Sequence, residues 1–258
     1  MPSRPLHRPL VRALEAIAPR TAIALRAWKH CYTGEPELRL LTALCDRQKL
    51  SLDIGGNLGV YTYFMARFSK GVIAFEPNPE LAARLRRGFA SGVQVEACAL
   101  SNQAGTAVLT VPLVDGAEEP GLGTIEKKDA KGFADGRRFN IETRRLDDHL
   151  EYPAAFIKID AEGHELAILE GGREFLATHR PSLLIEAEER HRKNAVGTLS
   201  AYLEGHGYAG YFLMGKTLKP IAALKECGSR AAIPNNFLFF ADDAQLDRVR
   251  SLLDGRLS

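Results

Sequence analysis

Cysteine is scarce in this 258-residue sequence, and no two cysteines are close together. They stand at four scattered positions: Cys31, Cys45, Cys98 and Cys227. Because they form no C-x-x-C pair and no metal-ligand spacing, they argue against a disulfide framework and against a zinc cluster. We therefore expect a protein of the reducing cytoplasm, and we assign no metal ligands.

Long apolar runs are also missing. No uninterrupted stretch approaches the roughly 18 to 20 apolar residues that a membrane-spanning helix needs. The apolar stretch that follows the basic first residues is interrupted by Arg12, Glu15 and Arg20, which argues against a secretory signal peptide. The sequence predicts no transmembrane segment.

Neither sign of charge dominates. Lys and Arg number 34 and Asp and Glu 32, so the formal net charge is +2. A net charge this close to zero does not attract the chain to nucleic acid, and we expect no nucleic-acid partner. The length suits one sizeable α/β domain with a proper core.

The N-terminal 46 residues are predicted to form a helical extension, and residues 47–258 the main domain. Leu10, Leu14 and Ile17 share one helical face before Pro19 interrupts the pattern. In the first half of the extension one acid, Glu15, stands among six basic residues: Arg4, Arg8, Arg12, Arg20, Arg26 and Lys29. This basic helix suits peripheral contact with an anionic membrane, an acidic partner, or a plain solvated face. The oligomeric state is left open.

From residue 50 onward, short apolar runs alternate with helical stretches, which is typical of βαβ units and a parallel sheet. Seven strands are predicted, at residues 50–53, 72–76, 93–98, 156–160, 183–186, 208–214 and 237–241. Helices are predicted at residues 60–68, 81–89, 164–170 and 196–206, with Asn78 and Pro79 marking the start of the second. The fold class is therefore α/β and Rossmann-like, a seven-stranded, mostly parallel sheet with helices on both faces. Residues 108–111 and 139–144 interrupt the alternation and predict a small inserted hairpin or lid.

The segment DIGGNLG, from Asp53 to Gly59, directly follows the first strand and leads into a helix. Gly55, Gly56 and Gly59 permit a close approach of backbone to ligand that a Cβ would block. The glycines alone fit a tight strand-to-helix turn almost equally well. Their spacing is not G-x-G-x-x-G, and Asp53 puts a carboxylate where a dinucleotide would lay its anionic pyrophosphate. S-adenosyl-L-methionine, a cation without phosphate, fits this turn better than NAD.

Glu76 ends the next strand, at about the distance downstream where an acid accepts hydrogen bonds from ribose hydroxyls. After the third strand, Cys98 and Ala99 should pass beside an adenine. The turn, the two acids and this segment together predict an adenosine-containing cofactor.

The segment FIKIDAEGHE, residues 156–165, is a buried strand that ends in acids and a histidine at the carboxyl edge of the sheet. Alternation puts Lys158 and Asp160 on one side, so Lys158 should be paired with a carboxylate. We predict Asp160 and Glu162, with His164 as a further candidate, as the catalytic residues on the acceptor side. Helix capping by the acids and a solvent-facing His164 are the structural alternatives.

Several of these motifs together resemble the FkbM-type methyltransferase family. The matching pieces run in the family's order: DIGGNLGVYTYFMA, VIAFEPNP, ALSN, LDDHL, FIKIDAEGHELAILEGG, PSLLIEAE and NNFLFF. The resemblance implies a class I methyltransferase fold and a bound S-adenosylmethionine. It carries over the cofactor residues Asp53, Gly55, Asn57, Gly59 and Glu76, and it places Asp160, Glu162 and Glu165 in a second signature. At Gly56 relatives often have alanine, and the position of His164 varies among them.

These observations predict S-adenosylmethionine-dependent O-methyl transfer to a hydroxyl of a sugar, a glycan or a small secondary metabolite. The alternatives are a noncatalytic binding or scaffolding protein on the same fold, and a methyltransferase that acts on nucleic acid or protein. Retained acids in both signatures disfavour the noncatalytic alternative.

Overall fold

A computed structural model describes residues 17–114, 116–126, 133–188, 194–226 and 234–256 of the chain. The predicted helix that carries Leu10 and Leu14, with Arg4, Arg8 and Arg12, lies outside these residues, as does Cys227. Within the described residues, no helix is long and apolar enough to cross a membrane.

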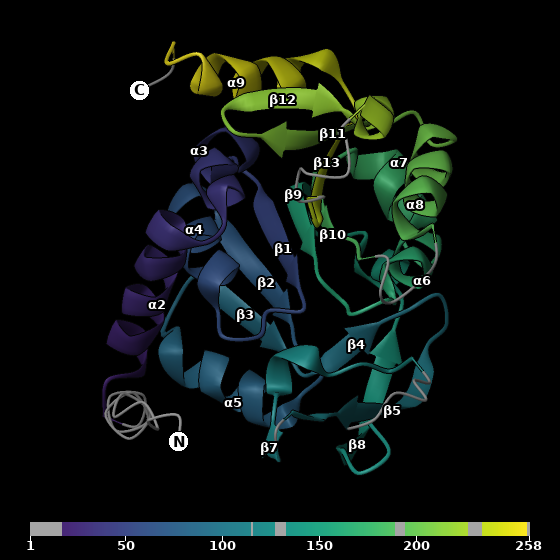
Figure 1. Cartoon of the computed structure of the whole chain (residues 1–258). Helices are drawn as coiled ribbons and strands as arrows, with labels where there is room; N and C mark the ends of the chain where they lie inside the picture. Colours follow the sequence, from purple (N-terminus) through teal and green to yellow (C-terminus); the bar gives the residue numbers. More distant parts are fainter. Residues whose placement is uncertain (1–16, 115, 127–132, 189–193, 227–233, 257–258) are drawn as a thin grey trace.

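The core is a central sheet in the order β12-β11-β13-β10-β9-β1-β2-β3 (Figure 1). The bounds are β1 Leu50–Ile54, β2 Gly71–Phe75, β3 Val93–Glu96, β9 Ala154–Ile159, β10 Ser182–Glu186, β11 Ala209–Met214, β12 Thr217–Pro220 and β13 Asn236–Phe240. The five strands from β3 to β10 pair in parallel, and β13 inserts antiparallel between β10 and β11. The predicted α/β class and mostly parallel sheet are confirmed.

The sheet has one strand more than predicted. All seven predicted strands are present, and β12 adds an eighth as the antiparallel partner of β11. This strand is four residues long, ends in a proline and contains no buried residue, so it has no apolar signature in the sequence. The third predicted strand also divides, because β3 ends at Glu96 and Cys98 begins β4 (Cys98–Leu100) of a second sheet.

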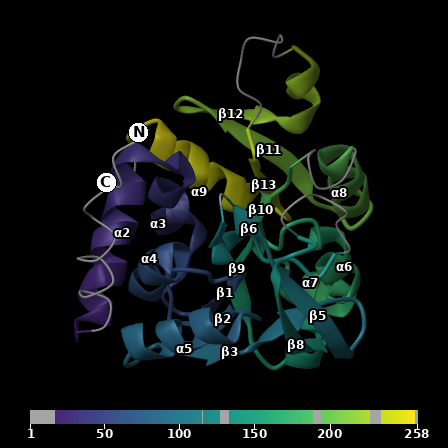
Figure 2. The same ribbon diagram turned by 60° about the horizontal axis from the view of Figure 1, so that its bottom comes forward.

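Helices cover both faces of the central sheet, as predicted (Figures 1 and 2). One face packs Ile157 and Ile159 of β9 against α6 (Glu165–Glu170), α7 (Arg173–His179) and α8 (Ala195–Glu204). The opposite face packs Phe156 against α4 (Val60–Phe68) and α9 (Asp243–Leu253). Near that face, α5 (Pro79–Gly88) begins as predicted, with the Asn78 side chain accepting from the backbone N–H of Glu80.

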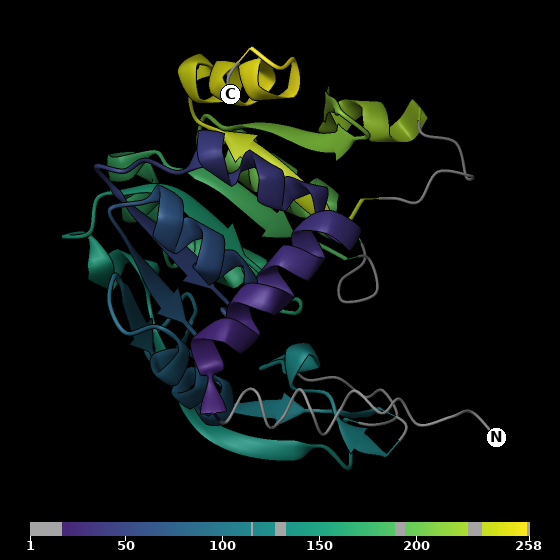
Figure 3. The same cartoon turned by 90° about the vertical axis from the view of Figure 1, so that its left-hand side faces the viewer.

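The N-terminal segment packs onto this second face. It comprises α2 (Pro19–Thr33), the 3₁₀ turn η1 (Pro36–Leu40) and α3 (Leu41–Leu44). Figure 3 shows α2 running beside the helices of this side of the molecule. Ala27, Leu41 and Leu44 are buried in one cluster with residues of α4 and β9. Residues 19–44 thus share the core of the sheet.

The inserted hairpin is also confirmed. β5 (Gly105–Val111) and β8 (Arg137–Arg144) pair antiparallel, and β4 joins β8 to complete a three-stranded sheet. Leu109 and Ile141 belong to a small core of its own. Two short strands, β6 (Leu113–Val114) and β7 (Ala117–Glu118), and the 3₁₀ turn η2 (Pro120–Leu122) follow β5. They lead the chain back to the carboxyl edge of the central sheet.

Candidate active site

The glycine-rich turn between β1 and α4 is shaped by its contact with β9. Gly55 has φ +83°, and a Cβ there would lie 1.9 Å from the carbonyl oxygen of Asp160. Asn57 also adopts a left-handed conformation, with φ 44°. The turn can therefore pass against the end of β9 only with glycine at position 55.

The other two glycines of the turn have different surroundings. A Cβ on Gly59, the N-cap of α4, would lie 2.9 Å from Leu85 of α5, and this glycine lines no pocket at the site. A Cβ on Gly56 would lie 3.1 Å from the same leucine. Gly59, predicted as a cofactor contact, is positioned to let α4 and α5 pack closely.

Glu76 organises the loop ends of the first two strands. Its buried carboxylate accepts hydrogen bonds from the backbone N–H of Asn57 at 2.7 Å and of Asn78 at 2.8 Å. Burial raises the pKa of Glu76 to about 7, against the opposing effect of these two bonds. One side chain thus fixes the glycine-rich turn relative to the start of α5.

Asp53 lies at the end of β1 and is also buried. The hydroxyl of Thr62, in the first turn of α4, donates a hydrogen bond to its carboxylate. Burial is the main cause that raises the pKa of Asp53 to about 6.

Three pockets meet at this edge of the sheet. The first pocket has an empty volume of about 630 Å³, its open mouth included. It brings together eight of the predicted residues: Gly55, Asn57, Glu76, Cys98, Ala99, Asp160, Glu162 and His164. Leu109 and Ile125 of the insertion and Ile168 of α6 add an apolar wall. The insertion therefore forms part of the site.

The second pocket, of about 500 Å³, lies on the other side of the turn and shares Gly55, Asn57 and Asp160 with the first. Asp53 and Gly56 line this pocket and not the first. The third and smallest pocket is lined by carboxylates alone: Asp160, Glu162, Glu165, Glu186 and Glu188. Asp160 is the residue that lines all three.

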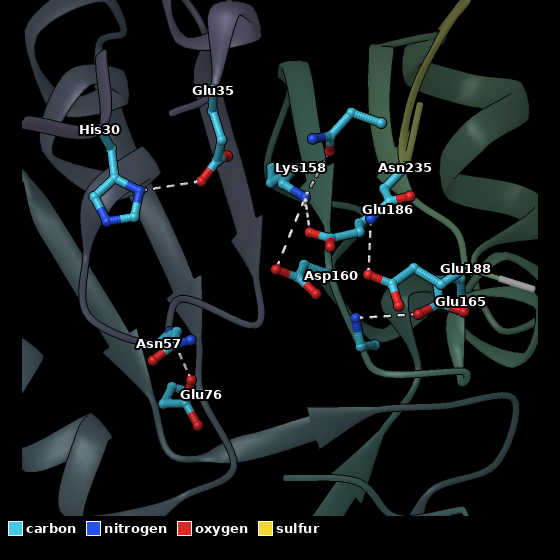
Figure 4. A network of polar contacts seen from close by, with 12 residues as sticks. His30, Glu35, Asn57, Glu76, Lys158, Asp160, Glu165, Glu186, Glu188 and Asn235 are labelled. Atoms are coloured by element: carbon cyan, nitrogen blue, oxygen red, sulfur yellow. Dashed lines mark hydrogen bonds and ion pairs between the residues drawn. The ribbon is translucent and has the colours of Figure 1, made fainter. Parts of the chain in front are cut away.

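Lys158 is the cation beneath these carboxylates, as the strand alternation predicts (Figure 4). Its side chain is 2% exposed, and Nζ lies 3.9 Å from Asp160 Oδ2 and 3.6 Å from Glu186 Oε2. Burial and the nearby Asp160 raise the pKa of Glu186 to about 7, while Lys158 opposes this rise. Sequence reasoning missed Glu186, although β10 ends there as predicted.

His164 has both ring nitrogens engaged. Nε2 lies 2.9 Å from Ser101 Oγ, just after β4, and Nδ1 lies 2.5 Å from Glu126 Oε1 of the insertion. Beside it, the Thr124 hydroxyl donates to the carbonyl oxygen of Glu162 at 3.0 Å. His164 thus ties the insertion to the core at the first pocket, and it does not line the third.

Glu165 acts on its own loop. Its buried carboxylate accepts from the backbone N–H of Gly163 at 2.9 Å and of Ala161 at 3.3 Å. These bonds hold the turn between β9 and α6, where Glu162 itself has a left-handed backbone with φ 51°.

The sequence from residue 53 to residue 209 matches the family described as the methyltransferase FkbM domain, more than half of the chain. The chain belongs to the FkbM methyltransferase family. The resemblance inferred from the motifs is thereby confirmed. Arg26, His30 and Glu35, which line the second pocket, precede the matched region.

Relatives of this FkbM chain are distant. It is 28% identical to Methyltransferase 1 of Beauveria bassiana (strain ARSEF 2860) over 145 residues, which is 46% of this chain and 57% of that protein. Among solved structures, the methyltransferase FkbM of Methylobacillus flagellatus KT is 20% identical with a TM-score of 0.49, covering 90% of this chain and 58% of that one. A Streptococcus mutans protein in complex with SAH is 12% identical with a TM-score of 0.46, covering 79% and 94%. The chain thus spans less than two thirds of the first two proteins.

Proposed function

We propose that this protein is an S-adenosylmethionine-dependent methyltransferase that methylates a hydroxyl of a sugar, a glycan or a small secondary metabolite. The observation that carries the proposal is the position of Asp160, which lines all three pockets at the carboxyl edge of the sheet. Ligands of open α/β sheets bind at this edge. Membership of the FkbM family supports methyl transfer.

The residues of the first pocket fit the adenosine part of the cofactor. Asn57 Oδ1 is buried and has no hydrogen-bond partner among the described residues, so it can accept from a ligand. Glu76 is the group for the ribose hydroxyls, which are hydrogen-bond donors. Cys98 and Ala99, with the apolar wall, provide a surface for the adenine. When bound, S-adenosylmethionine supplies a methyl group that is already activated by a positive sulfur.

The residues of the third pocket fit an acceptor with hydroxyl groups. A hydroxyl is a poor nucleophile at neutral pH, so a carboxylate within hydrogen-bond reach is needed to remove its proton. Asp160 and Glu162 are the proposed groups, because both line the first and the third pocket. Lys158 Nζ lies 3.9 Å from Asp160 Oδ2 and helps to keep this carboxylate in place.

The substrate proposal is tested by metabolite and glycan profiling of cells that lack the gene. We expect a species lighter by one methyl group, which the wild-type gene restores and the Asp160→Asn variant does not at equal protein level. No methyl difference, or full restoration by Asp160→Asn, would contradict the proposal.

With the acceptor in hand, Asp160→Asn or Glu162→Gln should lower turnover by roughly 10²- to 10⁴-fold, the usual contribution of a general base. Cofactor affinity and thermal stability should remain close to wild type. If Glu162→Gln instead destabilises the fold with normal turnover, its role is structural.

A further inference from the structure

The second pocket has a wall that lies outside the family match. Arg26 and His30 come from α2, and Glu35 comes from the turn that follows it. The opposite wall contains Lys158 of β9, and Figure 4 shows Glu35 on the side of the site that faces it. The N-terminal segment therefore closes a pocket that begins at the glycine-rich turn.

Charges of both signs surround this pocket. Arg26 and Lys158 are cations at neutral pH, and His30 can donate a hydrogen bond or carry a charge. His30 Nδ1 lies 3.4 Å from Glu35 Oε1. Three carboxylates also line the pocket: Glu35, Asp53 and Asp160. A wall of this kind suits a zwitterion better than a simple anion or cation, because each charge of the ligand finds its opposite.

The first turn of α4 can serve the anionic half of such a ligand. The Tyr61 side chain is buried there, and its hydroxyl lies near the Glu35 carboxylate. Burial raises its pKa well above the ordinary value, and the nearby Glu35 carboxylate raises it further, so the hydroxyl keeps its proton. Val60 and Tyr61 also begin α4, whose first turn has no side-chain cap and whose dipole favours negative charge.

We propose that the second pocket binds the amino-acid end of S-adenosylmethionine, with Arg26 and His30 of α2 as the groups for its carboxylate. The acidic groups of the wall take the ammonium. The first and second pockets share Gly55 and Asp160, so one cofactor molecule can occupy both, with its adenosine in the first pocket and its amino-acid end in the second. This inference rests on the proposed function, and it makes the N-terminal segment part of the cofactor site.

The test compares two ligands that differ only in the carboxylate: S-adenosylmethionine and decarboxylated S-adenosylmethionine. Calorimetric titration of the full chain gives both dissociation constants for wild type, Arg26→Gln and His30→Gln. Lys29→Gln is the matched control, because Lys29 is an exposed cation on the same helix and does not line the pocket. Glu76→Gln is the control for the adenosine side.

We expect wild type to bind the decarboxylated ligand about 10- to 100-fold more weakly, the value of a charge-assisted hydrogen bond. Arg26→Gln should weaken S-adenosylmethionine by a similar factor and leave the decarboxylated ligand within about twofold. His30→Gln should also weaken the binding of S-adenosylmethionine more than that of the decarboxylated ligand. If Arg26→Gln does not fold, the His30→Gln result alone tests whether α2 binds the carboxylate. Lys29→Gln should change neither constant.

The inference is overturned if both variants discriminate between the ligands as wild type does, or if they weaken the two ligands equally. In that case the proposed function would still stand if wild type binds S-adenosylmethionine and Glu76→Gln weakens the binding of both ligands. If wild type binds neither ligand, the proposed function and this inference fall together.

Discussion

Replacing Lys158 by methionine should destabilise the protein in a way that depends on pH. Methionine keeps the apolar stem and removes the ammonium that lies between Asp160 and Glu186. Breaking a fully buried ion pair costs about 3 to 5 kcal/mol. Because the two carboxylates are 31% and 28% exposed, water compensates part of this, and we expect a loss of about 1 to 3 kcal/mol above pH 7.

The direction of this pH dependence follows from the titration of Glu186. Its pKa of about 7 is already above the ordinary value of a glutamate, and Lys158 lowers it. Removing Lys158 raises the folded-state pKa further, while the unfolded chain keeps the ordinary value. An acid with a raised folded-state pKa loses stability as the pH rises from its unfolded pKa through its folded pKa. The cost of Lys158→Met should therefore be smaller near pH 5.5, where only the contact with Asp160 is lost, and largest above pH 7.

Urea denaturation at pH 5.5, 7.0 and 8.5 measures this cost. The double variant with Lys158→Met and Glu186→Gln is the control, and its loss should depend on pH much less. A loss from Lys158→Met that is equal at pH 5.5 and 8.5, or a double variant that is as pH-dependent as the single one, would refute the electrostatic account of this network.

Other predictions concern the glycine-rich turn and the acids. Gly55→Ala should cost at least about 2 kcal/mol more than Gly92→Ala in thermal denaturation: both have positive φ, but only at Gly55 does a Cβ meet an atom within 4 Å, the Asp160 carbonyl oxygen. Equal losses would contradict the contact. Affinity for S-adenosylmethionine should rise from pH 5 to above 7 with proton release in calorimetry, since a bound cation favours ionised Asp53 and Glu76, whose pKa values are about 6 and 7. A flat profile would exclude this coupling. Asp53→Ala and Glu76→Ala should each weaken binding by roughly 1 to 3 kcal/mol in the same titration, and unchanged affinity in both would oppose the assignment.

The sequence predicts well what depends on local pattern. The alternation that puts Lys158 and Asp160 on one side of β9 is a property of that strand alone. Glu186 was missed because its role depends on which strand neighbours β9 and in which register. Leu184 pairs with Lys158, so Glu186 comes to lie beside Asp160.

The N-terminal contribution to the second pocket was beyond the reach of sequence patterns. Arg26 and His30 look like members of a basic helix face, and nothing in their spacing refers to β9. Their position follows from the packing of α2 against α4. At Gly59 the sequence predicted a cofactor contact where the structure shows a packing contact. A glycine that makes room for Leu85 looks the same in the sequence as one that makes room for a ligand.

The proposed function requires that the pockets beside the glycine-rich turn bind S-adenosylmethionine in preference to a dinucleotide. Calorimetric titration of the wild-type protein with S-adenosylmethionine and with NAD measures this preference. We predict saturable one-site binding of S-adenosylmethionine and at least about tenfold weaker binding of NAD, because Asp53 attracts the cation and repels the pyrophosphate. Equal or tighter binding of NAD, or no binding of S-adenosylmethionine, would contradict the claim.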